Sequence, residues 1–181
     1  MVKSAYSFET KKEKVKQYII VVWVDNESGV LARVIGLFSG RGYNIDSLAV
    51  AIIDKKNNMS RITIVTSGTP QVLQQIKLQL GKLVPVHKVA GFETNKKTLL
   101  REMALLKVAS SKQKLNKAQK ICEKYKSIIL DKTSKSFIFE VSALKKEIDE
   151  LIQKLQPLGL ASVSRTGVVA MTKGSEIYQQ N

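Results

Sequence analysis

Seven consecutive apolar residues at positions 18–24 constrain the fold of this chain more than any other feature of its sequence. This run, YIIVVWV, is rich in β-branched side chains and predicts a central strand that is covered on at least one face. The polar residues 25–29 then predict a turn. From Val30 onwards apolar residues recur at helical spacing, until Gly40 and Gly42 indicate the end of a helix. The folded part of the chain therefore begins with a strand, a loop and a helix.

The rest of the first half continues this alternation of strands and helices. A strand is predicted at residues 44–53, and a polar turn at 54–58 joins it to a second strand at 61–66. A helix at 70–83 and a last strand at 84–90 follow. Along the first of these strands, the apolar residues change from odd to even positions after Ile45, which predicts a bulge near Asp46. The resulting order, βαββαβ, is typical of a ferredoxin-like sandwich.

The second half repeats this order after a short polar linker. Strands are predicted at residues 102–109, 127–132, 137–142 and 160–165, helices at 112–125 and 144–155, and an added strand at 168–171. The predicted fold class is α+β, with two tandem ferredoxin-like βαββαβ sandwiches. The predicted domains are a first domain at residues 18–92 and a second domain at 99–174, joined by the linker at 93–98. A flexible N-terminal arm at 1–17 precedes them, and a tail at 175–181 follows.

The composition limits the chemistry that the chain can perform. His87 is the only histidine and Cys122 the only cysteine, which excludes a thiolate metal cluster and an intrachain disulfide. Both residues are expected to be structural, Cys122 in a helix core. The motifs of serine hydrolases, zinc proteases, P-loop enzymes and dinucleotide-binding proteins do not occur. Because the sequence also has no membrane-length apolar run and no secretory signal, we expect a cytoplasmic protein that is not an enzyme and has no metal site.

The net charge of +15 is the one property that favours a different function. Strongly basic proteins bind nucleic acids, and βαββαβ is also the order of an RNA-recognition motif. The excess charge is spread along the chain, however, and only five of the thirty basic residues are arginine. The predicted strand SRITIVT carries no aromatic residue on which a base could stack. RNA binding is therefore the less favoured alternative.

The polar loop before the first helix is the candidate binding site. The first backbone N–H groups of the helix, at Gly29, Val30 and Leu31, lack acceptors within the helix and lie at the positive end of its dipole, so a carboxylate fits there. Asn26 is suited either to cap the helix or to bind a ligand. Asn44, farther along the chain, adds an amide that accepts from an ammonium group and donates to a carboxylate. An ordinary capped helix is the alternative interpretation of these residues.

Long colinear segments of the sequence resemble one known family. NESGVLARVIGLFSGRGYNIDSL begins at Asn26, and SRITIVTSG, QIKLQLGKLVPVHKV and REMALLKV follow it in order. A looser match runs through IILDKTSKSFIFEVS and LQPLGLASVSRTGVVAMTKG to Gly174. These segments resemble the small regulatory subunit of acetohydroxyacid synthase, which is also called acetolactate synthase.

The resemblance implies a regulatory subunit of branched-chain amino acid biosynthesis. It implies an N-terminal ACT domain that forms a homodimer, and a large catalytic subunit that carries thiamine diphosphate, FAD and Mg²⁺. It also implies activation of that subunit and feedback inhibition, usually by valine, with leucine and isoleucine left open. An ACT-domain sensor that regulates a different enzyme is the alternative.

The family's effector-binding residues fall on two segments of this sequence. The loop residues are Asn26, Glu27, Ser28, Gly29, Val30 and Leu31, and the contacts from the partner side are Asn44 and Ile45. By this resemblance the apolar side chain of valine is expected to be covered by Val30, Leu31 and Ile45.

Overall fold

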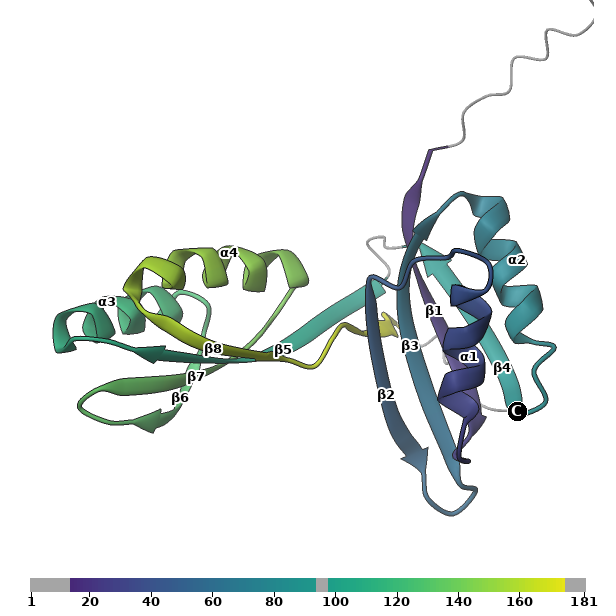
Figure 1. Ribbon diagram of the computed structural model, residues 1–181, viewed down its shortest axis with the longest axis horizontal. Helices are drawn as coiled ribbons and strands as arrows, with labels where there is room; N and C mark the ends of the chain where they lie inside the picture. Colours follow the sequence, from purple (N-terminus) through teal and green to yellow (C-terminus); the bar gives the residue numbers. More distant parts are fainter. Residues whose placement is uncertain (1–13, 94–97, 175–181) are drawn as a thin grey trace, which may run out of the picture.

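The computed structural model describes residues 14–93 and 98–174 (Figure 1). Most of the expected arm, most of the linker and the tail lie outside these residues. The elements of the first half are β1 (Lys16–Asp25), α1 (Val30–Ser39), β2 (Ser47–Asp54), β3 (Met59–Gly68), α2 (Pro70–Leu80) and β4 (Val86–Glu93). Those of the second half are β5 (Thr98–Ala109), α3 (Lys112–Glu123), β6 (Ile128–Lys132), β7 (Ser136–Ala143), α4 (Lys145–Leu155), the 3₁₀ turn η1 (Gln156–Leu158), β8 (Leu160–Arg165) and β9 (Val169–Thr172).

The first half forms an antiparallel sheet in the order β2-β3-β1-β4, with α1 and α2 on one face (Figure 1). β1 is central because its apolar run is buried on both faces, as its sequence predicts. Alternate β1 residues form a core with apolar residues of the sheet and both helices, which include Ile20, Val22, Val34, Phe38, Ile76 and Leu80. The predicted βαββαβ order is confirmed.

The second half repeats the sandwich with the strand order β6-β7-β5-β8 and with α3 and α4 on one face. Its core includes Leu106, Leu115, Phe139 and Ile148. Cys122 is fully buried in that core, as expected. The predicted fold class, two tandem ferredoxin-like sandwiches, is thereby confirmed.

The predicted bulge near Asp46 is wrong. β2 begins only at Ser47, and its register with β3 shifts at the opposite end, between Ile52 and Asp54. The alternation of apolar residues is interrupted because Ile45 lies before the strand begins, in a segment that is not part of the sheet. Its side chain still packs against the core. Ile45 is therefore held by a loop rather than by the sheet.

The two halves meet through a β-ribbon that the sequence did not predict. β5 starts at Thr98 rather than at residue 102, and its first four residues pair with β9 instead of with the second sheet. The ribbon lies on the face of the first sheet opposite the helices (Figure 1). There Val168 and Ala170 are buried against residues of β1, namely Ile19, Val21 and Trp23. The ribbon thus gives the first sheet a second apolar core.

A cluster of charged side chains holds the place where β5 enters the second sheet. Glu102 is buried, and its two carboxylate oxygens accept hydrogen bonds from Arg165 Nε and Nη2 at 2.9 and 2.6 Å. Arg165 Nη1 donates to Asp149 Oδ1 of α4 at 2.6 Å. These bonds, the one to Glu102 foremost, raise the pKa of Arg165 above its ordinary value. The charged guanidinium therefore ties β5, β8 and α4 together.

Candidate functional site

The loop between β1 and α1 presents backbone donors at the surface. Gly29 is the N-cap residue with a φ of 84°, and no side chain caps the helix. Val30 N makes only a long bond of 3.4 Å to Glu27 O, and among the described residues Leu31 N and Ala32 N find no backbone acceptor. The first turn of α1 contains no acidic residue that would neutralise the helix dipole. These donors suit a carboxylate.

Asn26 does not cap the helix, because its side chain is bound by the turn between β2 and β3 and by the start of β3. Asn26 Nδ2 donates to Asn58 Oδ1 at 3.3 Å, and Ser60 Oγ donates to Asn26 Oδ1 at 3.1 Å. The carboxylate of Asp54 accepts from Asn57 N and Nδ2 at 3.0 and 2.7 Å, and these bonds lower the pKa of Asp54. The loop therefore rests on an ordered turn, and one N–H of the Asn26 amide remains for a ligand.

The other side chains of the loop differ in what they contribute. Glu27 is exposed and pairs with Arg33 at 2.9 Å. Val30 is buried in the core beneath the helix. Its side chain is thus not available to cover a ligand, contrary to the expectation, and only its backbone remains. Leu31 is partly exposed and can still contribute apolar surface.

Asn44 and Ile45 lie at the opposite end of the sheet from the loop of the same chain. The loop follows Asp25, which lies level with Asp54 at the end of β2, whereas Asn44 precedes Ser47 at the start of β2. A strand rises about 3.3 Å per residue, so the length of β2 separates the two groups by roughly 20 Å. The expected site residues therefore fall into two candidate half-sites, which one chain does not bring together.

The second half-site is held by hydrogen bonds from β3. Thr66 Oγ1 donates to Asn44 O at 2.6 Å, and Ser67 Oγ donates to Asp46 Oδ2 at 2.8 Å. Asn44 Nδ2 donates to Asp46 Oδ1 at 2.5 Å. No donor in the described part of the chain bonds the amide oxygen of Asn44, which leaves this oxygen able to accept from an ammonium group.

The same segment contacts the second half of the chain. Val168 N donates to Ser47 Oγ at 2.9 Å. Gly167 has a φ of 78°, and a Cβ at this position would lie 2.9 Å from both Leu48 O and Ser47 Oγ, so only glycine fits without a shift of the backbone. Sequence reasoning missed Ser47 and Gly167, because no local pattern signals a contact between residues so far apart in the chain.

The sheet face that an RNA-recognition motif would use is covered by the β5–β9 ribbon. Trp23 is buried there, next to Val168 and Ala170, and is not open to a base. His87 Nε2 lies 2.7 Å from Asp25 Oδ1 at the sheet edge, in agreement with a structural role. Residues 14–93 and 98–174 contain no cluster of three or more His, Cys, Asp or Glu that would hold a metal. No helix in this part of the chain has the length and apolarity needed to span a membrane.

Comparisons with known proteins agree with this architecture over both halves. Residues 101–174 match the family model for the small subunit of acetolactate synthase, and residues 20–88 match that for the AHAS small subunit-like ACT domain. The crystal structure of the acetolactate synthase small subunit from Thermotoga maritima has a TM-score of 0.81 and 30% sequence identity, and the match covers 89% of this chain and 99% of that chain.

Individual relatives match over almost their whole length. The probable acetolactate synthase small subunit of Archaeoglobus fulgidus is 35% identical over 160 residues, which is 88% of this chain and 99% of the relative. The acetolactate synthase isozyme 3 small subunit of Escherichia coli K12 is 36% identical over 162 residues, which is 89% of this chain and 98% of the relative. The chain therefore belongs to the family of acetolactate synthase small subunits, and its first half is an ACT domain.

Proposed function

We propose that this chain is the non-catalytic regulatory subunit of a cytoplasmic acetolactate synthase, which activates a large catalytic subunit and makes it sensitive to feedback inhibition by valine. The observation that carries the proposal is the pair of half-sites at opposite ends of β2 in the ACT domain. Family membership supplies the identity of the enzyme. Thiamine diphosphate, FAD and Mg²⁺ are assigned to the large subunit by the family resemblance.

A homodimer formed along the β2 edge would complete the site. β2 is an edge strand, and its side chains Val50 and Ile52 are 46% and 52% exposed. The other edge strand, β4, carries polar His87 and Lys88 instead. An unpaired apolar edge favours pairing with a second strand. If two β2 strands pair antiparallel, the start of one lies beside the end of the other.

This arrangement would place the loop of one chain against Asn44 and Ile45 of the other. The effector's carboxylate would accept from the free N–H groups of Leu31 and Ala32, and its ammonium group would donate to the amide oxygen of Asn44. Leu31 and Ile45 would cover the apolar side chain. An amino acid with a small apolar side chain, such as valine, satisfies all three contacts.

The second half-site also offers a path to the second domain. Asn44 and Ile45 are adjacent to Asp46 and Ser47, and Ser47 accepts from Val168 N beside β9. An effector that shifts the segment before β2 would therefore act on the ribbon that joins the two domains. By family resemblance, we assign to the second domain a role in bringing the large subunit to full activity or full inhibition.

The proposal is tested by reconstitution with the cognate large subunit. Acetolactate formation from pyruvate is measured for the large subunit, for this chain and for their mixture, each with and without valine. We expect no turnover by this chain alone, higher turnover by the mixture than by the large subunit, and inhibition by valine only in the mixture. Turnover by the isolated chain, or a mixture no more active and no more sensitive to valine than the large subunit alone, would contradict the proposal.

A further inference from the structure

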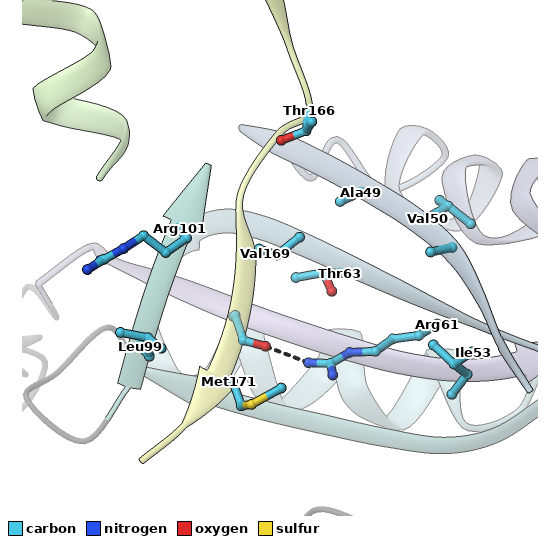
Figure 2. Close-up of a pocket in the computed structure, with 12 residues that line it drawn as sticks. Ala49, Val50, Ile53, Arg61, Thr63, Leu99, Arg101, Thr166, Val169 and Met171 are labelled. Carbon is cyan, nitrogen blue, oxygen red and sulfur yellow. Dashed lines mark hydrogen bonds between the residues drawn. The ribbon is translucent and has the colours of Figure 1, made fainter. Parts of the chain in front are cut away.

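A cavity of about 440 Å³ lies between the first sheet and the β5–β9 ribbon, on the face opposite the helices (Figure 2). The ribbon packs over β1, so the part of the sheet nearest to β2 is left partly uncovered. Ala49 and Thr63 face each other across β2 and β3, and Ala51 faces Arg61. Because three of these four side chains are small, they leave a hollow beneath the ribbon. Its volume is within the range of about 300 to 1,000 Å³ found for small-molecule sites.

The walls of the cavity are mostly apolar, and its charged groups are all cationic. Ile53, Leu99, Val169 and Met171 line it together with the alanines. Arg61 and Arg101 are its two charged residues, but the guanidinium of Arg101 points away from Arg61 and donates to Leu100 O (Figure 2). The lining contains no aspartate or glutamate. Such a site attracts an apolar molecule with a negative charge.

Arg61 is a partly buried cation without an ion-pair partner among the described residues. Its Nη2 donates to Ala170 O at 2.6 Å (Figure 2). Its guanidinium lies 5.6 Å from the centre of the Trp23 ring. Its Nε is buried and has no hydrogen-bond acceptor. Burial lowers the pKa of Arg61, which means that its charge is poorly compensated. A carboxylate in the cavity would compensate it through a charge-assisted hydrogen bond.

We propose that this cavity is a second ligand site, distinct from the effector loop, and that it binds a small apolar monocarboxylate without an ammonium group. The carboxylate would lie beside Arg61, and the hydrocarbon part would lie over Ala49 and Ala51. An ammonium group is disfavoured because the Arg61 cation would repel it and no acidic side chain lines the cavity to accept its hydrogen bonds. The proposal does not depend on the function proposed above, since it rests on the cavity alone.

Ligand binding in this cavity would link the two domains. Ala49, Ala51 and Arg61 belong to the first sheet, whereas Leu99 and Met171 belong to the ribbon. A molecule that contacts both would stabilise their association. Bound carboxylate should therefore raise the melting temperature of the full chain in a concentration-dependent manner.

The test uses 4-methylpentanoate, with leucine as the matched control because the two differ only by the ammonium group. Isothermal titration of the full chain should show one 4-methylpentanoate site per chain, and an excess of leucine should not displace the ligand from it. Ala51→Leu fills the cavity and Arg61→Gln removes its charge, and each should weaken binding at least about tenfold. Ala51→Leu, which keeps Arg61, decides the test if Arg61→Gln fails to fold.

Gly29→Asp, which alters only the effector loop, should bind 4-methylpentanoate as the wild type does. Competitive displacement by leucine, or unchanged binding in Ala51→Leu, would overturn the proposal. So would wild-type protein that binds no 4-methylpentanoate at millimolar concentration. If the wild type does not bind 4-methylpentanoate and Ala51→Leu changes the oligomeric state, a second copy of the chain occupies the cavity instead.

Discussion

The Oγ of Ser47 accepts a hydrogen bond from the backbone N–H of Val168 at 2.9 Å, although 121 residues separate the two positions. Ser47 opens β2 directly after the second half-site, and Val168 precedes β9, the strand that pairs with β5. The bond thus connects the segment expected to contact the effector with the ribbon between the domains.

Loss of this bond is expected to uncouple inhibition from effector binding. Ser47→Ala leaves Val168 N without its acceptor, at a cost of about 1 kcal/mol in stability. We predict that valine still binds with nearly wild-type affinity, measured by isothermal titration, but that the maximal inhibition of the reconstituted enzyme falls.

Gly167→Ala provides a second test of the same contact. The added Cβ would lie 2.9 Å from Leu48 O, and the φ of 78° disfavours alanine, so the substitution forces the two segments apart. We expect the same loss of inhibition as for Ser47→Ala, with a larger loss of stability. Full inhibition of both variants by valine would show that the contact does not transmit the signal.

A negative charge at position 29 is predicted to abolish feedback inhibition while the protein stays folded. An aspartate there would occupy and repel the place of the effector's carboxylate, yet it would be compatible with the helix dipole. A Cβ at Gly29 meets no atom within 4 Å, so the substitution adds only backbone strain of order 1 kcal/mol. The measurement is inhibition of the reconstituted enzyme by valine, with a thermal melt as control.

Gly174→Asp is the matched control for this variant. Gly174 has the same φ of 84° as Gly29, and its Cβ position is also free of contacts within 4 Å. It should keep normal inhibition. If Gly29→Asp melts near the wild type and is still inhibited at the same valine concentration, the effector does not bind at this loop.

A charge on the exposed edge of the first sheet is predicted to dissociate the dimer. In a two-fold symmetric pairing of β2 strands, Ile52→Lys introduces two cations into an apolar interface, and the dissociation constant should rise by more than about tenfold. Leu78→Lys on α2 is the control, because Leu78 is 58% exposed, similar to the 52% of Ile52. Analytical ultracentrifugation distinguishes the two variants, and a dimer that tolerates Ile52→Lys but not Leu78→Lys places the interface elsewhere.

Local patterns in the sequence predicted most of the fold and singled out one of the two candidate half-sites. The order of strands and helices follows from apolar periodicity, and the loop at Gly29 is recognised by its polar residues between a strand and a helix. The β5–β9 ribbon was not predictable in this way, because residues 98–101 have the same alternation whether they pair with β9 or continue the second sheet. Its position depends on burial of Val168 and Ala170 against β1, which is a non-local contact.

The division of the candidate site also arises from topology rather than from a motif. Asn26 and Asn44 are close in sequence, but α1 returns the chain to the opposite end of the sheet before β2 begins. Likewise, the sequence did not indicate that Asn26 would bond to Ser60 and Asn58 in place of the helix N-terminus.

The thiol of Cys122 is predicted to be unreactive in the folded protein. Burial raises its pKa to about 12, so the thiolate that reacts with iodoacetamide is scarcely populated at neutral pH. Since an unfolded thiol has a pKa of about 8.5, the folded state loses stability as the pH rises above that value. Alkylation at pH 8 should therefore follow the unfolding curve in urea, and rapid alkylation without denaturant would show that α3 opens readily.

The shared effector site is tested most directly by mixing two inactive variants. Gly29→Asp damages the loop half-site and Asn44→Ala damages the other, so each homodimer should lose valine binding. In a mixed dimer, the intact loop of the Asn44→Ala chain faces the intact Asn44 of the Gly29→Asp chain, which restores one site. After co-refolding in equal amounts, isothermal titration should recover about one quarter of the wild-type valine sites. A mixture that binds no more valine than the separate variants would contradict a site built from two chains.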